Sequence, residues 1–267
     1  MSHHSDLTGF IGKTSAGGIF LRYIARWSIP QSSIDYSLAF RPLQSAIPSS
    51  DLPDYPHPKN PTTMRLPYIP DDPKMETEED AAVVQRVKDR RGGKLIALDK
   101  TLLHAPPVAN GWNGFLGAIR TQTSLPDSIR ELAICRVAVL NKAWYEWDSH
   151  RPILEKSGVL SAEAIEHLKE RPRANEEVAR RQEAETMGEN LFDEKHSAVL
   201  EYTDAMTIGC IVPEPVFERL RSFFTEREVV EITSTIAAYN CVSRFLVALD
   251  VGEMAEKYGV DMSGKAA

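Results

Sequence analysis

The chain has 267 residues, of which 42% are hydrophobic and 26% charged, and its formal net charge is −7. These values exclude a largely disordered chain, a fibrous protein and a small disulfide-stapled fold, and the acidic charge argues against binding nucleic acid. No apolar run approaches the roughly 18 residues that a membrane-spanning helix needs, so no membrane partner is expected. We therefore expect a soluble globular protein with a sizeable core.

Residues 1–63 differ in composition from the rest of the chain. Prolines are dense between positions 30 and 61, and no helical period is sustained. We expect an irregular N-terminal arm that packs on the body or on a neighbouring subunit. The apolar, arginine-containing segment 18–26 leaves organelle targeting by this arm as an alternative. A helical domain is expected to follow over 64–267.

From residue 78 onward the apolar residues recur with a helical period. A capping box at Thr225–Glu228 and an N-cap at Ser161 mark two helix starts, and Pro106–Pro107 is expected to end a short helix. Convincing alternating strands are missing, so the predicted fold class is all-α. The expected helices cover 78–91, 98–104, 108–120, 127–140, 144–156, 161–169, 176–187, 194–207, 214–223 and 226–250.

Segment 229–249 is more apolar than one buried helix face requires. Part of it is therefore expected to bury against another subunit, which predicts a homo-oligomer, either a dimer, a trimer or a hexamer.

The three cysteines, Cys135, Cys210 and Cys241, are far apart and form no Cys-x-x-Cys pair. Each lies among apolar neighbours, which favours a small buried side chain over a reactive thiol. An odd number of isolated cysteines indicates a reducing compartment, so we expect a cytoplasmic protein without a disulfide framework.

The densest group of chemically active side chains surrounds His150. Glu146 precedes His150 by four positions, so both project from one helix face, beside Ala143 and Trp147. A carboxylate and an imidazole beside an aromatic wall suit proton transfer in an apolar pocket, whereas a solvated surface pair is the alternative. Glu131 would lie about 28 Å from His150 on one straight helix. A turn near Asn141 would let Glu131 orient the imidazole.

These segments resemble the carboxymuconolactone decarboxylase family of the AhpD-like superfamily, over about residues 95–254. The resemblance implies an AhpD-like all-α fold that assembles into oligomers. The segments that carry it are Arg130-Glu131-Leu132-Ala133-Ile134, Tyr145-Glu146-Trp147 with His150, Gly158-Val159, the run from Ala198 to Met206, and the run from Glu228 to Phe245.

The peroxidase branch of that superfamily has a glutamate, a Cys-x-x-Cys and a histidine, and the two cysteine positions fall here on Ala143 and Glu146. Without these thiols, disulfide cycling cannot run at this site. The chain therefore resembles the decarboxylase branch more closely. That resemblance implies a lyase acting by general acid/base catalysis on a lactone, keto acid or polyketide-like carbon acid.

Such a reaction needs an acid/base group, a donor to a developing oxyanion and a cation for a substrate carboxylate. We assign His150 as the proton shuttle, oriented by Glu131, with Glu146 or Tyr145 at the oxyanion. Arg244, or with less support Arg120, is expected to hold the carboxylate. Further candidates for binding the small organic substrate are Asn240, Trp147 and Trp112.

Three alternatives remain at this point. Glu131, Glu146 and His150 have the residue types of a two-carboxylate, one-histidine metal site, but we expect neither a metal nor a cofactor. A thiol-dependent hydroperoxide reductase would need a relocated cysteine. A non-catalytic oligomeric binding protein with the same fold would lack a pocket large enough for a ring.

Overall fold

The computed structural model describes residues 64–171 and 191–260, and every regular element in these ranges is a helix. The predicted all-α, AhpD-like fold class is confirmed. The arm at 1–63 and the expected helix at 176–187 lie outside the described residues. The helices are α1 (Glu78–Arg90), α2 (Ala97–Leu102), α3 (Pro106–Thr121), α4 (Asp127–Leu140), α5 (Trp144–Lys156), α6 (Ala162–Glu170), α8 (Glu194–Ile208), α9 (Glu214–Arg221), α10 (Glu226–Leu249) and α11 (Met254–Tyr258).

The N-terminal signals read from the sequence form the expected hydrogen bonds. Ser161 Oγ accepts from the Ala164 amide at 3.1 Å and thereby caps α6. The carboxylate of Glu228 accepts from the Thr225 amide at 2.8 Å, while the Thr225 hydroxyl accepts from the Glu228 amide. This reciprocal capping box satisfies amides that would otherwise lack partners in the first turn of α10.

The proline pair at 106–107 behaves differently from the prediction. We expected it to end the preceding helix, but Pro106 and Pro107 form the first turn of α3, and α2 already ends at Leu102. Proline has no amide hydrogen, and the first-turn amides of a helix have no partner within the helix. A proline pair therefore starts a helix as readily as it stops one. The short helix α11 was not predicted.

The predicted turn near Asn141 is present and is a Schellman motif. Ala143 donates to the Ala138 carbonyl at 2.8 Å, and Lys142 donates to the Val139 carbonyl at 3.1 Å. Lys142 takes a left-handed conformation with φ of 55°, where glycine is more usual. The turn ends α4 and starts α5, so the two helices pack against each other.

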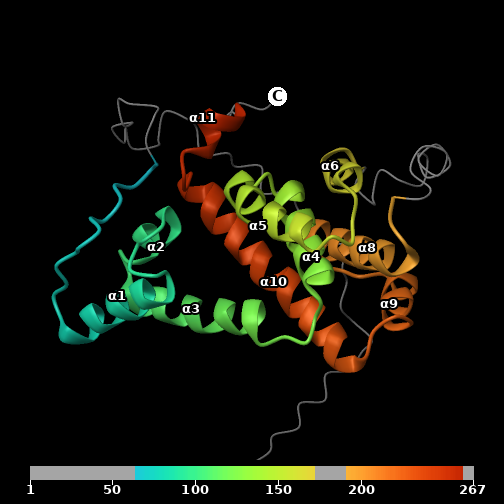
Figure 1. The fold of residues 1–267 in the computed structure, drawn as a ribbon, viewed down its shortest axis with the longest axis horizontal. Helices are drawn as coiled ribbons and strands as arrows, with labels where there is room; N and C mark the ends of the chain where they lie inside the picture. Colours follow the sequence, from blue (N-terminus) through green and yellow to red (C-terminus); the bar gives the residue numbers. More distant parts are fainter. Residues whose placement is uncertain (1–63, 172–190, 261–267) are drawn as a thin grey trace, which may run out of the picture. The chain divides into compact units, whose positions relative to one another are not determined.

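Helix α4 forms the centre of the core and contacts α5, α6, α8 and α10. Figure 1 shows α10 running past α4 and α5. Among the described helices, only α10 is long and apolar enough to cross a membrane, judged by length and composition. α10 also packs on α3, α4, α5, α8 and α9, so part of its apolar surface lies in the core.

A buried ion pair between α4 and α8 also contacts α6. The Arg136 guanidinium on α4 donates to both carboxylate oxygens of Asp204 on α8, at 2.6 and 2.9 Å. Both side chains are 1% exposed. Arg136 also donates to the carbonyls of Leu168 and Arg171, at and just beyond the end of α6. This network fixes the packing of α4, which carries Glu131.

Candidate functional site

The turn between α4 and α5 brings Glu131 and His150 into contact. The Nδ1 of His150 lies 2.6 Å from Oε2 of Glu131, and both side chains are buried. The second carboxylate oxygen, Oε1, accepts from Nε of Arg130 at 3.2 Å. Glu131 is therefore held from two sides inside the core, where its position fixes the plane of the imidazole.

The other ring nitrogen of His150 meets a tyrosine that the sequence analysis did not place in the site. The hydroxyl of Tyr239 on α10 lies 3.2 Å from Nε2 of His150, and the two rings meet edge to face. The same hydroxyl oxygen accepts from Nε of Arg120 on α3 at 2.8 Å. One buried hydroxyl thus joins the imidazole to a guanidinium.

The donor Arg120 at one end of this chain and the acceptor Glu131 at the other determine where the protons lie. A guanidinium only donates, so the Tyr239 oxygen accepts from Arg120 and its own hydrogen is free to point at His150. Nε2 of a neutral His150 then accepts, and Nδ1 carries the hydrogen that is donated to Glu131. Burial raises the pKa of Tyr239 well above its ordinary value, against the opposing charge of Arg120, so the phenol keeps its hydrogen.

Glu146 lies four residues before His150 on α5 and is buried. The hydroxyl of Ser243 on α10 lies 3.2 and 3.0 Å from its two carboxyl oxygens. Burial raises the pKa of Glu146 well above its ordinary value, although the Ser243 hydrogen bond and the charge of Arg120 act in the opposite direction. The raised pKa favours the protonated form of Glu146, which can donate a hydrogen bond.

A cavity of about 190 Å³ opens between α3, α5 and α10. Its lining combines Glu146 and His150 with apolar side chains, so a ligand would meet acid/base groups next to an apolar surface. The lining residues are Arg91, Ile96, Leu98, Arg120, Tyr145, Glu146, Ser149, His150, Ile153, Val242 and Leu246.

Two of the lining side chains are arginines. Arg91 also pairs with Asp99, whose carboxylate lies 3.0 Å from its Nε. Asp99 is shared with Arg90, the pKa of which is lowered by burial and by the charges of Arg91 and Arg120. The arginines of this region thus lie close enough to repel one another. A bound anion would relieve that repulsion.

Three of the four residues assigned to catalysis line the cavity, namely Tyr145, Glu146 and His150. The fourth, Glu131, contacts His150 from within the core. Burial raises the pKa of Tyr145, and the backbone amide of Leu98 acts in the opposite direction. Its hydroxyl therefore stays protonated at neutral pH.

The substrate-binding candidates lie elsewhere. Arg244 is exposed and donates to Oδ1 of Asn240 at 2.6 Å, and Asn240 also bonds to Asn141 and Thr207. Trp147 is buried in the core, and Trp112 packs on Phe245. None of these four candidates is a lining residue of the cavity. Arg120, the less favoured arginine in the sequence analysis, is one.

The cysteines do not reach the cavity. Cys135 is buried on α4, where burial raises the pKa of its thiol well above the ordinary value, so a thiolate is disfavoured. Cys210 and Cys241 are exposed, and neither is a lining residue. Within residues 64–171 and 191–260, no group of three histidine, cysteine, aspartate or glutamate side chains is arranged to hold a metal ion.

A family model matches the segment that holds most of this site. Residues 106–171 match the carboxymuconolactone decarboxylase family. A search of curated proteins found no match.

Solved structures share the fold at low sequence identity. An uncharacterised peroxidase-related protein from Silicibacter sp. is 19% identical, with a TM-score of 0.52 over 73% of this chain and 92% of that one. An AhpD-core protein from Ralstonia eutropha is 18% identical, with a TM-score of 0.52 over 70% and 90%. The debrominase Bmp8 is 14% identical, in a variant that has alanine in place of a cysteine and is bound to 2,3,4-tribromopyrrole. Its TM-score is 0.53 over 74% of this chain and 100% of that one.

Proposed function

The chain carries a carboxymuconolactone decarboxylase segment at residues 106–171 within an AhpD-like helical fold, and from this premise we propose that it is a general acid/base enzyme. Its substrate is a small carbon acid that carries a carboxylate, such as a lactone or a keto acid. The observation that carries the proposal is the Glu131–His150 pair, whose imidazole lines a cavity that also holds a buried carboxyl group and two arginines.

In the first step, His150 acts as a base. Neutral His150 has its hydrogen on Nδ1, so Nε2 takes a proton from the substrate carbon, and the electron pair stays on the substrate as an enolate. The contact from Nε2 to Tyr239 is 3.2 Å, against 2.6 Å from Nδ1 to Glu131. The longer contact is the one that an entering substrate displaces. Glu131 then stabilises the imidazolium.

Glu146 supports the developing enolate from the same helix. As a neutral acid, it donates a hydrogen bond to the enolate oxygen, which a carboxylate would repel. Arg120 holds the substrate carboxylate at the cavity wall. If the substrate instead loses carbon dioxide, the broken carbon–carbon bond leaves its electron pair as the same enolate. In that case His150 enters the step as an imidazolium, protonated from solvent, and donates that proton to the enolate carbon.

Thiol-dependent peroxide reduction has less support than acid/base chemistry here. That reaction needs an accessible thiolate next to the base. Cys135 is buried, and the other two cysteines do not line the cavity.

Deuterium exchange tests the proposal without knowledge of the natural substrate. Carboxylated γ-lactones and β-keto acids are incubated with the protein in D₂O. Proton NMR follows the loss of the α-hydrogen signal, and carbon dioxide release is measured separately. At least one compound should exchange or decarboxylate faster with the wild-type chain than with His150→Ala. His167→Ala is the matched control because His167 lies outside the cavity. Equal rates for wild type and His150→Ala across the panel would contradict the proposal.

A further inference from the structure

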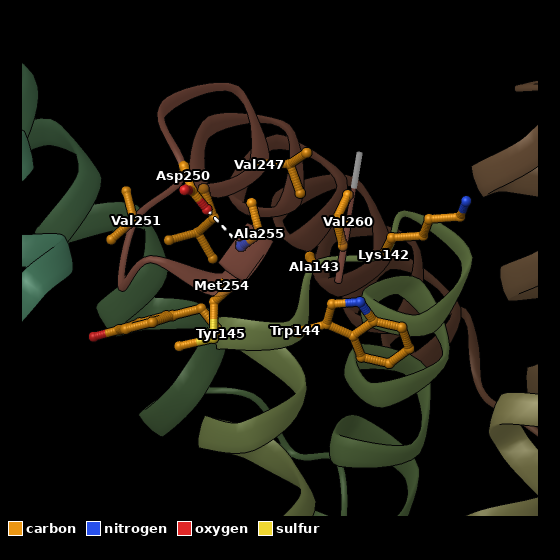
Figure 2. A pocket seen from close by; sticks show the side chains of 11 residues that line it. Lys142, Ala143, Trp144, Tyr145, Val247, Asp250, Val251, Met254, Ala255 and Val260 are labelled. Carbon is orange, nitrogen blue, oxygen red and sulfur yellow. Dashed lines mark hydrogen bonds between the residues drawn. The ribbon is translucent and has the colours of Figure 1, made fainter. Parts of the chain in front are cut away.

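A second, smaller pocket is lined in part by Tyr145. It has a volume of about 20 Å³ and lies between the start of α5, the end of α10 and α11 (Figure 2). Most of its walls are apolar, formed by Ala143, Leu246, Val247, Val251, Met254 and Ala255. The space is large enough for one small group, and its charged lining residues are Lys142 and Asp250.

This pocket and the catalytic cavity share part of their lining. Tyr145 and Leu246 line both. The two spaces differ in chemistry, because the cavity carries Arg91 and Arg120 whereas most residues that line the small pocket are apolar. Together they match a molecule with a carboxylate at one end and an apolar substituent at the other.

Gly252 and Met254 set the position of the Tyr145 ring. A Cβ at Gly252 would lie 2.5 Å from Cδ2 of Tyr145 and 2.9 Å from Cε of Met254, and Gly252 has a φ of 79°. Only glycine lets the backbone approach the ring this closely. Figure 2 shows the Met254 side chain beside Tyr145. Since methionine is flexible, its movement would enlarge the pocket at low cost.

Backbone strain is concentrated around the same pocket. Four non-glycine residues with positive φ occur in the described ranges, and three of them, Lys142, Asp250 and Glu253, lie in the two turns that border it. Such conformations cluster at functional sites. Polar links also hold α11 over the pocket, since Lys257 and Tyr258 both bond to Asp148 on α5.

We propose that this pocket is a subsite for a short aliphatic substituent of the same substrate whose carboxylate is held in the catalytic cavity. The inference rests on the proposed function for the carboxylate end and adds the apolar end. Tyr145 then lies alongside the bound chain, between the reacting groups and the subsite.

A series of straight-chain carboxylates from acetate to octanoate tests the subsite by calorimetric titration of the full chain. Affinity should rise about fourfold for each methylene that reaches the pocket and should then level off when the pocket is full. In parallel, the methyl signal of Met254, assigned by Met254→Leu, should shift with the longer members and not with acetate.

Ala255→Leu fills the pocket and should abolish the rise with chain length while leaving acetate binding unchanged. Ala237→Leu, on an exposed part of α10, is the matched control and should retain the rise. Equal affinity along the series, or an unmoved Met254 signal with octanoate, would overturn the subsite and leave the proposed function standing. If no carboxylate bound to the wild-type chain, the anion site on which both proposals rest would be overturned.

Discussion

The hydroxyl oxygen of Tyr239 lies 3.2 Å from Nε2 of His150 and links α10 to the reacting face of α5. The same oxygen accepts from Arg120, which also lies over the tyrosine ring, 5.6 Å from its centre. One side chain therefore positions both the group that we assign to proton transfer and the group that we assign to the substrate carboxylate.

Replacing Tyr239 with phenylalanine should affect both roles. We expect kcat to fall roughly tenfold and KM to rise by a similar factor, since a lost buried hydrogen bond costs about 1 kcal/mol or more at each partner. Tyr202→Phe is the matched control, because the buried Tyr202 hydroxyl bonds to Thr233, away from the cavity. Steady-state kinetics on a substrate found by deuterium exchange would measure both. A change in stability equal to that of Tyr202→Phe with unaltered kinetics would contradict the positioning role.

The buried acid Glu146 predicts an unusual dependence of stability on pH. Its folded-state pKa is raised, so above the unfolded pKa of about 4.3 the folded state holds a proton that the unfolded state has lost. Stability therefore falls as pH rises from there to the folded pKa, by about 1.4 kcal/mol per pH unit. Glu146→Gln removes this titration, so its stability gain over wild type should grow with pH.

Thermal melts of both proteins from pH 4 to pH 8 measure this gain. Glu163→Gln, at an exposed position on α6, controls for loss of a surface carboxylate and should not reproduce it. A stability difference between Glu146→Gln and wild type that stays constant over this pH range would show that Glu146 is ionised in the folded chain.

On α4 and α5 the sequence predicted residues that the structure brings together, but on α10 it selected residues one position away from those that contact the site. It selected Asn240 and Arg244, which are four apart on α10. The residues that reach His150 and Glu146 are Tyr239 and Ser243, also four apart. One residue turns a helix face by about 100°, and an apolar helix buried on several sides gives no period that would choose between these pairs.

The contact between Glu131 and His150 was easier to anticipate. It required only that the helical pattern stop near Asn141, where a polar pair interrupts the apolar residues. The proline pair at 106–107 was misread for a physical reason, since a residue without an amide hydrogen suits a helix start and a helix stop equally. Arg91 caps the end of α1. It is far from the other site residues in the sequence, so no local pattern predicted that it would line the cavity.

The cysteines provide a test that separates acid/base from thiol chemistry. Because none lines the cavity, the combined substitutions Cys135→Ala, Cys210→Ser and Cys241→Ser should leave turnover within about threefold of wild type. The buried Cys135 should cost roughly 1 kcal/mol of stability through lost packing. Turnover and denaturant unfolding are measured on the same samples. Abolished turnover in Cys241→Ser alone, with the fold intact, would favour a thiol mechanism.

The buried pair of Arg136 and Asp204 predicts strong coupling across the core. Arg136→Met leaves Asp204 charged and buried without its partner, which should cost about 3–5 kcal/mol in the free energy of unfolding. The double variant Arg136→Met, Asp204→Leu should lose less than the sum of the single variants, because no charge is left buried alone. Urea denaturation of the four proteins measures the coupling. Additive losses would mean that the two side chains stabilise the fold independently.

The charge of Glu131 determines which nitrogen of His150 carries the hydrogen, and Glu131→Gln should reverse it. Arg130 donates to Oε1, so the amide oxygen of the glutamine would stay at Arg130 and its NH₂ group would face Nδ1 of His150. Nδ1 would then accept, and the hydrogen would move to Nε2, where the substrate needs a lone pair. Nitrogen-15 NMR of the imidazole should report the change from an Nδ1–H to an Nε2–H tautomer.

Turnover should fall on the order of 10²–10⁴-fold in Glu131→Gln, the range for a misplaced or lost general base. The melting temperature should change little, because the amide keeps the size of the carboxylate and retains a bond to Arg130. Glu155→Gln, which weakens an exposed pair with Arg151 on the same helix as His150, is the matched control and should keep both the tautomer and the rate. If Glu131→Gln kept the Nδ1–H tautomer and lost its rate nonetheless, Glu131 would act through its charge on the imidazolium rather than by orienting the ring.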